Sequence, residues 1–370
     1  MQKVQNPKKL LYITNGISGS GGLERVLSIK TDYLQRIYGY SITILTLNEF
    51  DASNFFEFNA QIEVVSMKVE GNPLKYIYHY IKNIKKNVNE INPDLICVCD
   101  DGLKGFFIPT ILRKKYPIIY ERHVSKIIEL GENPNFVKKA ITNLKFFLMN
   151  KLAKTFTKFI VLTEDNKKEW QLDTIEVIPN PLSFYPEDSS SLDKKNVLAV
   201  GKQSYQKGYD RLLNVWSIVQ KEYPDWELNI YGTIHPENKY KKIAENLKIE
   251  NSVNFFPANK NIEEIYLNSS IYVMSSRFEG FGMVLIEAMA CGVPCVTFDC
   301  PYGPSNIVQN DVDGFVIENG NIEKLAFALI ELISNESKRL KFGKNAKINS
   351  KKYLPENIMS IWNNLFKAYL

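Results

Sequence analysis

The sequence has few cysteines and no long apolar run. Its five cysteines are an odd number in 370 residues and lack a second Cys or His pair at zinc spacing: Cys97, Cys99, Cys291, Cys295 and Cys300. We therefore expect neither a disulfide framework nor a zinc site, and we predict that these thiols are small buried residues. No stretch approaches the roughly 20 apolar residues that span a bilayer, so a membrane-spanning protein is not expected.

The chain as a whole also lacks a large excess of charge of one sign. The chain has 46 Lys and Arg against 41 Asp and Glu, a net charge of +5. A dedicated nucleic-acid binder usually has a denser basic surface, so we expect no nucleic-acid partner. The N-terminal residues MQKVQNPKKLLYIT have only a short apolar run and are typical of a tail leading into a strand, not of a signal peptide. These features predict a cytoplasmic protein.

Short apolar runs alternate with helical patterns in both halves of the chain, which predicts parallel βαβ units and an α/β fold. The length predicts two domains. We place the first over residues 1–182, a Pro- and Ser-rich linker over 183–196, the second domain over 197–353, and a final helix over 354–370 that could pack back on the first domain. Strands are expected at 10–14, 41–47, 94–99, 118–121, 159–163, 197–200, 226–231, 253–256, 271–274, 294–298 and 314–317.

The strongest motif is RFEGFGMVLIEAMACG, from Arg277 to Gly292, which follows an expected buried strand. Gly282 permits a tight turn before a helix, and the free N–H groups at that helix start suit an anion. Glu279 in the loop and Glu287 in the helix could accept hydrogen bonds from vicinal hydroxyls. Two carboxylates beside an anion site predict a ligand that is part polyol and part phosphate.

Two further loops follow expected strands. Lys202 and Lys207 come after the strand at 197–200, where their ammonium groups could neutralise a diphosphate. The glycine-rich loop at 16–22 could bring backbone amides to a phosphate. Its spacing is neither that of a P-loop nor GxGxxG, so a dinucleotide oxidoreductase is not expected.

Together these elements resemble the retaining glycosyltransferases of family 4, and the resemblance spans nearly the whole chain. It implies the GT-B architecture, in which two Rossmann-like domains face each other across a cleft. Four motifs of the family appear here: Glu-x7-Glu as Glu279 and Glu287, the basic pair as Lys202 and Lys207, Gly-Gly-x-Glu-Arg as residues 21–25, and Ile-Pro-Asn-Pro as residues 178–181.

The resemblance also implies a division of roles. Glu287 would hold the ribose hydroxyls of the nucleotide and Glu279 the hydroxyls of the donor sugar, while Lys202 and Lys207 would neutralise the leaving diphosphate. Lysines in place of a metal imply a metal-independent reaction without a cofactor. Backbone amides would bind sugar or phosphate at four positions: Gly22, Phe281, Gly282 and Met283.

The resemblance places the acceptor side in the first domain. His123, after the strand at 118–121, would contact the acceptor hydroxyl or the donor sugar, with Glu121 and Arg122 as alternatives. The chain departs from the family at Lys202, where Arg is usual, and at Asn306, where Glu is common, which leaves the donor sugar open.

We therefore predict a hexosyl- or N-acetylhexosaminyltransferase that uses a nucleotide-diphosphate sugar, with a UDP-sugar favoured. The acceptor would be a saccharide or a lipid-linked saccharide, and the resemblance implies surface polysaccharide or glycolipid biosynthesis. The alternatives are an epimerase or phosphorylase of the same fold, and a non-catalytic protein that binds a nucleotide sugar.

Residues 135–160 contain six lysines and no acidic residue. One helical stripe is expected to face the core, formed by Val137, Ile141, Leu144, Leu148 and Leu152. Phe146, Phe147 and Met149 are expected to lie off that stripe, among the lysines. The mixture predicts peripheral contact with an anionic membrane surface, on its inner face; the alternative is a solvated basic helix whose aromatics lie in the core.

Overall fold

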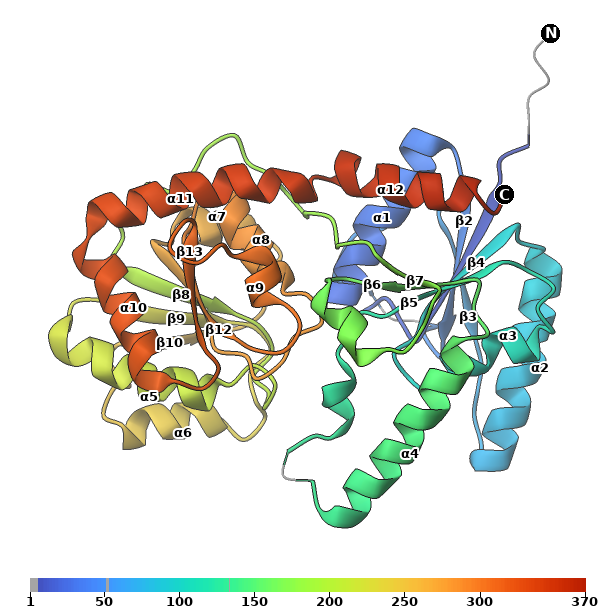
Figure 1. Cartoon of the computed structure of the whole chain (residues 1–370), viewed down its shortest axis with the longest axis horizontal. Coiled ribbons are helices and arrows are strands. Elements are labelled where there is room, and N and C mark those ends of the chain that lie inside the picture. The colour runs from blue at the N-terminus through green and yellow to red at the C-terminus, as the bar shows by residue number, and fades with distance from the viewer. Residues whose placement is uncertain (1–5, 51–52, 133) are drawn as a thin grey trace, which may run out of the picture. The chain divides into compact units, whose positions relative to one another are not determined.

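The structure is a computed structural model that describes residues 6–50, 53–132 and 134–370. The first five residues of the expected N-terminal tail lie outside this range. The chain divides into two compact units (Figure 1). Unit 1 comprises Met1–Val124, Asn135–Pro181 and Pro355–Leu370, and unit 2 comprises Ser125–Pro134 and Leu182–Leu354. Each contains one parallel β-sheet, so the predicted α/β class is confirmed.

Unit 1 has a seven-stranded parallel sheet in the order β3-β2-β1-β4-β5-β6-β7. Alternate residues of β1 enter two separate cores, Leu10 and Tyr12 on one face and Leu11 and Ile13 on the other. The sheet is therefore covered by helices on both faces. Its strands are β1 (Lys9–Thr14), β2 (Ser41–Leu47), β3 (Glu63–Met67), β4 (Leu95–Cys99), β5 (Ile118–Glu121), β6 (Lys158–Val161) and β7 (Ile175–Val177). Its helices are α1 (Gly22–Tyr38), α2 (Pro73–Ile91), α3 (Ile108–Ile111), α4 (Phe136–Ala153) and α12 (Pro355–Lys367).

Unit 2 has a six-stranded parallel sheet in the order β10-β9-β8-β11-β12-β13. Its strands are β8 (Asn196–Val200), β9 (Glu227–Tyr231), β10 (Val253–Phe256), β11 (Ile271–Met274), β12 (Cys295–Asp299) and β13 (Gly314–Glu318). Its helices are α5 (Tyr209–Glu222), α6 (Lys239–Asn246), α7 (Ile262–Leu267), α8 (Met283–Ala290), α9 (Pro304–Ile307), α10 (Ile322–Ser334) and α11 (Glu336–Ser350). Short 3₁₀ helices occur at Gly105–Phe107, Lys126–Glu129, Asp165–Glu169 and Lys351–Tyr353.

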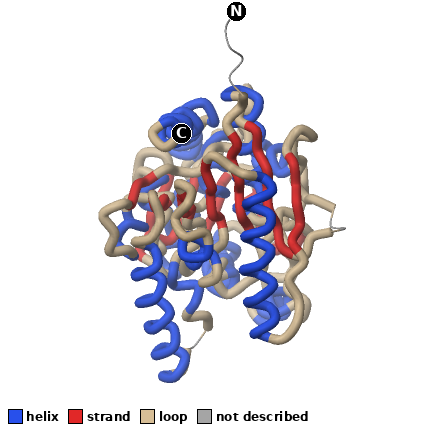
Figure 2. Tube along the Cα trace, turned by 90° about the vertical axis from the view of Figure 1, so that its right-hand side faces the viewer, coloured by secondary structure: helices blue, strands red, loops and turns tan. Residues whose placement is uncertain are grey.

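Both sheets reverse their strand order at one place, between β1 and β4 in unit 1 and between β8 and β11 in unit 2. Figure 2 shows strands lying between helices, as expected for doubly wound sheets. At such a reversal the loops after the two neighbouring strands diverge and leave room for a ligand beyond the carboxyl ends. This topology determines which loops can meet in each unit.

The boundaries of the units differ from the sequence expectation in two segments. Ser125–Pro134, expected within the first domain, belongs to unit 2. Residues 183–196, expected to be a linker, belong to unit 2. Ser190 donates its amide to the carbonyl of Cys291 at 2.8 Å and its hydroxyl to the carbonyl of Ser269 at 2.7 Å. The nearby Leu192 is buried. These bonds and this burial fix the segment against unit 2.

The final helix, α12, belongs to unit 1. Trp362 and Phe366 lie in the same apolar core as Leu34 of α1, and the Tyr40 hydroxyl donates to Oδ1 of Asn363 at 2.9 Å. The described residues contain no helix that is long and apolar enough to cross a membrane.

The predicted core face of α4 is wrong. Val137, Ile141 and Leu144 are exposed, although they were expected to face the core. Leu148 and Leu152 are half-buried. The helix instead packs on unit 1 through a different stripe, formed by Thr142, Phe146, Met149 and Ala153, of which Met149 and Ala153 are completely buried. Phe147 is exposed, as expected.

Candidate functional site

In unit 2, the loops that follow β8 and β11 meet through a buried ion pair. Lys207 Nζ lies 2.8 Å from Oε1 of Glu279, and the Ser276 hydroxyl donates to the same oxygen at 2.6 Å. Both charged side chains are mostly buried. The structure thus brings together two of the predicted site residues, at the place where the sheet reverses its strand order.

Glycine at position 208 makes this approach possible. Gly208 has a left-handed φ of +64° and starts α5, and a Cβ there would lie 2.3 Å from the carbonyl oxygen of Ser275. The Ser275 hydroxyl donates to the carbonyl of Lys207 at 2.9 Å. No side chain fits between the loops at this position, so Gly208 fixes where Lys207 is held.

An ion pair that the sequence analysis did not identify joins the same two loops. Arg277 donates through Nη1 and Nη2 to the two carboxylate oxygens of Asp210, at 2.8 and 2.5 Å, and also to the carbonyl of Tyr205 at 2.9 Å. Partial burial alone would raise the pKa of Asp210, but the hydrogen bonds and charge of Arg277 outweigh it and lower that pKa. This bidentate pair positions the loops, and its only sequence signal is an arginine two residues before Glu279.

Glu287 lies within α8 and is almost fully buried. Its Oε1 accepts a hydrogen bond from the Ser183 hydroxyl at 2.8 Å, and its Oε2 accepts one from the Tyr266 hydroxyl at 3.3 Å. Gly282 caps the start of α8 with a φ of +104°. The amide of Met283, the first helical residue, has no acceptor within the helix. The helix therefore offers free amides at its start and a carboxylate one turn further along.

The remaining predicted residues of unit 2 are Lys202 and Phe281. Lys202 is exposed, follows Gly201 at the end of β8, and forms no ion pair among the residues that the structure describes. The Phe281 ring is buried against Tyr353, with ring centres 5.6 Å apart. The ring of Phe281 is thus not available to a ligand, and the predicted contact through its backbone amide stays a prediction.

In unit 1, the glycine-rich loop surrounds a carboxylate. Glu49 accepts hydrogen bonds from the amides of Ile17 and Ser18 at 2.7 and 3.1 Å, and from the Ser18 hydroxyl at 2.5 Å. These two amides are therefore already used and do not face a phosphate, contrary to the simplest expectation for the loop. Gly22 is the first residue of α1, after the cap Gly21, so its amide has no acceptor within that helix.

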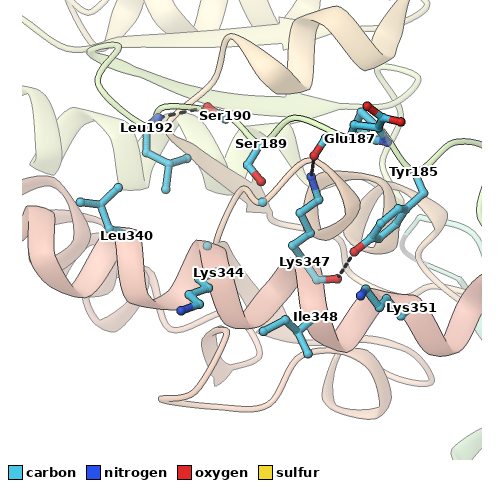
Figure 3. Close-up of a pocket in the computed structure, with 13 residues that line it drawn as sticks. Tyr185, Glu187, Ser189, Ser190, Leu192, Leu340, Lys344, Lys347, Ile348 and Lys351 are labelled. Atoms are coloured by element: carbon cyan, nitrogen blue, oxygen red, sulfur yellow. Dashed lines mark hydrogen bonds between the residues drawn. The ribbon is translucent and has the colours of Figure 1, made fainter.

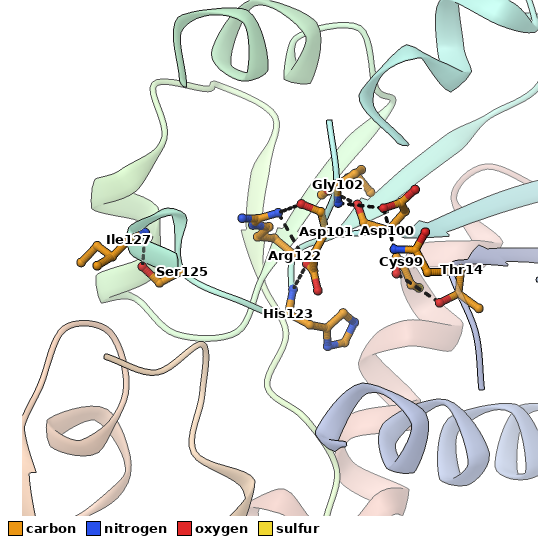
Figure 4. A network of polar contacts seen from close by, with 11 residues as sticks. Thr14, Cys99, Asp100, Asp101, Gly102, Arg122, His123, Ser125 and Ile127 are labelled. Atoms are coloured by element: carbon orange, nitrogen blue, oxygen red, sulfur yellow. Dashed lines mark hydrogen bonds and ion pairs between the residues drawn. The ribbon is translucent and has the colours of Figure 1, made fainter. Parts of the chain in front are cut away.

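The acceptor-side candidates follow β5 (Figure 4). Arg122 donates to the carbonyl of Asp101 at 2.7 Å, and the amide of His123 lies 3.4 Å from Oδ1 of Asp101. The His123 ring is largely buried; its Nδ1 has no hydrogen-bond partner within the described chain, and its Nε2 faces Oε2 of Glu121 at 3.5 Å. Arg122 thus connects two loops through Nη1, while its Nε and Nη2 and the Nδ1 of His123 have no hydrogen-bond partner in the described chain.

Glu121 forms a completely buried ion pair behind His123. Lys30 of α1 places Nζ 2.7 Å from Oε1 of Glu121 and 2.9 Å from the centre of the Trp362 ring in α12. Nε2 of His123 lies 3.5 Å from the other carboxylate oxygen, Oε2. Burial alone would raise the pKa of Glu121, but Lys30 and, after it, His123 outweigh the effect of burial, and the pKa falls to about 2. Glu121 is therefore an ionised group of the core and not a free acid or base.

One group of side chains has ligand atoms close enough for a metal ion: Cys99, Glu121 and His123, all within 4.8 Å of one another. The charge of Glu121 is already balanced by the Lys30 ammonium. Burial raises the pKa of the Cys99 thiol, which opposes the thiolate that a metal needs. These residues therefore fit a polar core better than a metal centre. The other four cysteines are likewise buried and free, as predicted.

Unit 2 also has an open cavity of about 590 Å³ between α11 and residues 185–192 (Figure 3). Lys347 points into it and donates to the carbonyls of Glu187 and Asp188 at 2.9 and 2.5 Å. The Tyr185 hydroxyl donates to the carbonyl of Lys347 at 3.2 Å. None of the predicted site residues lines this cavity, and the Lys347 ammonium serves to hold the chain segment in place.

Comparison with known proteins points to one family. The family described as "Glycosyl transferases group 1" matches residues 185–349. An uncharacterised glycosyltransferase of Haemophilus influenzae is 32% identical over 97% of this chain and 99% of its own length. The amylovoran biosynthesis glycosyltransferase AmsD of Erwinia amylovora is 30% identical over 96% of this chain and 99% of its own length.

Solved structures share the fold. Anabaena HepE in complex with UDP-glucose superposes with a TM-score of 0.77 at 19% identity, over 97% of this chain and 99% of that one. Such low identity supports the fold and not the ligand. The architecture of the chain is accordingly the GT-B fold that these glycosyltransferases share.

Proposed function

This chain belongs to the group 1 glycosyltransferases, and from that premise we propose that it is a retaining enzyme of the family 4 type. It transfers a hexosyl or N-acetylhexosaminyl group from a UDP-sugar to a saccharide or lipid-linked saccharide. The pathway is the assembly of a surface polysaccharide or glycolipid, the kind of process named for the Erwinia relative. Membership of this family makes the protein a glycosyltransferase. The UDP-sugar donor, the retention of configuration at C1 and the biosynthetic pathway are what we propose.

The observation that carries the proposal is the contact between Lys207 and Glu279 at 2.8 Å, where the sheet of unit 2 reverses its strand order. A cation and a carboxylate held together there suit a sugar diphosphate. The carboxylate accepts hydrogen bonds from sugar hydroxyls, and the ammonium faces the phosphates. Glu287, one turn into α8, is then assigned to the ribose, and the amides of Phe281, Gly282 and Met283 to phosphate or sugar.

The chemistry follows from this charge arrangement. The bond between C1 of the sugar and the diphosphate oxygen breaks, leaving positive charge on the sugar ring and negative charge on the diphosphate. Lys207, Lys202 and the start of α8 stabilise the departing anion, and preorganised charges of this kind are usually the largest catalytic contribution. The acceptor oxygen bonds to C1 on the face that the diphosphate leaves, and its proton passes to a phosphate oxygen.

The acceptor side is assigned to unit 1. Nδ1 of His123 has no hydrogen-bond partner in the described chain, so it can bind a hydroxyl of the donor sugar or the acceptor. The Gly22 amide supplies a further donor at the start of α1. Glu121 is paired with Lys30 and is not assigned this role. Nε and Nη2 of Arg122 have no hydrogen-bond partner in the described chain, so Arg122 stays an alternative to His123.

A thermal-shift screen of UDP-glucose, UDP-galactose, UDP-N-acetylglucosamine and GDP-mannose tests the donor. A UDP-sugar should raise the melting temperature, because a ligand that binds only the folded state stabilises it. Lys207→Ala should abolish that shift and lower kcat by roughly 10²–10³-fold. The matched control is Lys221→Ala, since Lys221 is exposed on α5 of the same unit.

Other outcomes correct separate parts of the proposal. Stabilisation by GDP-mannose alone would overturn the choice of base, and stabilisation by none of the four would overturn the donor assignment. Conversion of the free UDP-sugar to its epimer without an acceptor would identify an epimerase. Inversion at C1 in the purified product, read from its anomeric NMR coupling, would overturn the retaining mechanism. We expect activity to persist in EDTA, because Lys207 and the helix start supply the positive charge.

A further inference from the structure

Helix α4 has an apolar face that unit 1 leaves uncovered. Five large side chains on it are exposed: Phe136 by 85%, Val137 by 63%, Ile141 by 63%, Leu144 by 61% and Phe147 by 64%. We refer to these five residues as the outer face of α4. At 3.6 residues per turn, this face lies about opposite the stripe with Met149 and Ala153 that packs on the core. A helix that is apolar on both sides is normally buried all round.

The charge around the outer face has one sign. No acidic residue occurs from 136 to 163, while lysines occupy positions 138, 139, 145, 151, 154 and 158. Among these, Lys158 is paired with Glu176 at 3.3 Å. The chain as a whole has nearly equal numbers of basic and acidic residues. The excess of lysine is therefore local to the helix that exposes apolar side chains.

A second, smaller patch of the same composition lies at the beginning of α2. Leu74, Ile77 and Tyr78 are exposed there, and Lys75 and Lys82 accompany them. Both helices follow a strand of the parallel sheet, so both begin at its carboxyl edge. Figures 1 and 2 show α2 and α4 extending past this same edge of the sheet. The two helices that carry these patches therefore extend to the same side of unit 1.

We propose that the outer face of α4, assisted by the first turns of α2, docks unit 1 on a bilayer that contains anionic lipids. Apolar side chains enter the boundary between headgroups and acyl chains, and long lysine side chains reach back to the anionic headgroups. The complementary charge favours lipid over a protein partner, because a bilayer presents negative charge along the whole length of the helix.

The docked position has a consequence that rests on the proposed function. His123 and Gly22 lie after β5 and β1, at the same carboxyl edge from which α2 and α4 begin. Docking would bring this edge to the headgroup layer, within reach of a saccharide carried on a lipid. The bilayer contact itself does not depend on the donor or on the reaction.

Flotation of the full chain with vesicles tests the contact. Vesicles of phosphatidylcholine mixed with phosphatidylglycerol should carry the protein upward, pure phosphatidylcholine vesicles should not, and high salt should weaken binding. Leu144→Gln together with Phe147→Gln should weaken partitioning at least about tenfold, because two apolar side chains no longer enter the bilayer. Phe327→Gln is the matched control, since Phe327 is 60% exposed on α10 of unit 2.

Each outcome decides the proposal. Absence of flotation, equal binding to both kinds of vesicle, or unchanged binding of the α4 variant would overturn it. Light scattering that shows a wild-type dimer and a monomeric α4 variant would identify the outer face as an interface between two copies, which also overturns it. UDP-sugar thermal shifts on the same samples confirm that the variants are folded and report separately on the proposed function.

Discussion

Replacing Lys30 by methionine keeps an unbranched side chain and removes its charge from the core of unit 1. Glu121 then loses the ammonium 2.7 Å from its Oε1 while its carboxylate stays buried. Burial alone would raise the pKa of Glu121, whereas Lys30 and His123 together bring it down from 4.5 to about 2. Removing one partner of a buried ion pair leaves an uncompensated charge and typically costs about 3–5 kcal/mol, so Lys30→Met should lower the free energy of unfolding by roughly 3 kcal/mol at pH 7.

Urea unfolding and calorimetry at pH 7 measure this loss. The double variant Lys30→Met/Glu121→Leu should recover most of it, because no unpaired charge remains in the core. Lys86→Met is the control, since Lys86 is exposed on α2 and its removal should change stability by under ~0.5 kcal/mol. Fluorescence of Trp362, whose ring touches the Lys30 ammonium, should change in Lys30→Met and not in Lys86→Met.

Acid provides a second measurement of the same pair. The pKa of Glu121 in the folded protein is below its ordinary value of 4.5, so the stabilisation is complete above that pH and is lost as the pH falls towards 2. The stability advantage of the wild type over Lys30→Met should shrink across this window. A folded Lys30→Met variant within ~1 kcal/mol of wild type at pH 7, or a double variant no more stable than the single one, would refute the reasoning.

Two further predictions concern the loops of unit 2. Gly208→Ala should cost at least ~2 kcal/mol of stability and weaken UDP-sugar binding in calorimetric titration, because the new Cβ meets the Ser275 carbonyl in a left-handed turn; Gly39→Ala, with a similar φ and open space, should leave binding unchanged. Asp210→Asn should lower kcat/KM roughly tenfold, since Arg277 loses a charged partner worth ~1.5 kcal/mol or more; unchanged kinetics would contradict its positioning role.

Central strands could be predicted from the sequence because they are continuous apolar runs. β2, β5, β10 and β11 have the expected bounds, and most of the others differ by one or two residues. The pattern does not reveal β3 and β7, which form the two edges of the sheet of unit 1. An edge strand is half-exposed, so its residues need not be uniformly apolar, and β7 has only the three residues Ile175–Val177. Such strands are defined by pairing with a neighbour, which a local pattern does not contain.

The candidate site could likewise be predicted from the sequence only in part. Lys207 and Glu279 could be associated because each follows a strand, and parallel strands end at one edge of their sheet. Arg277 and Asp210 were not associated, since neither belongs to a recognisable spacing. Glu49, which fills the glycine-rich loop, lies just after the neighbouring strand β2, 31 residues away from Ser18. Contacts between loops that follow neighbouring strands depend on the order of the strands in the sheet. The spacing of residues in the sequence does not give that order.

Helix α4 shows that hydrophobic periodicity does not always predict which face of a helix packs on the core. A helix with apolar residues on two faces has two stripes of equal period, and the sequence does not say which one meets the sheet. Thr142 and Ala153 on the inner stripe are small, which lets the helix lie close to the core. The opposite stripe, with Ile141, Leu144 and Phe147, is more apolar and yet exposed. The more hydrophobic face is therefore the one that unit 1 leaves exposed, and it is the face that we propose docks on an anionic bilayer.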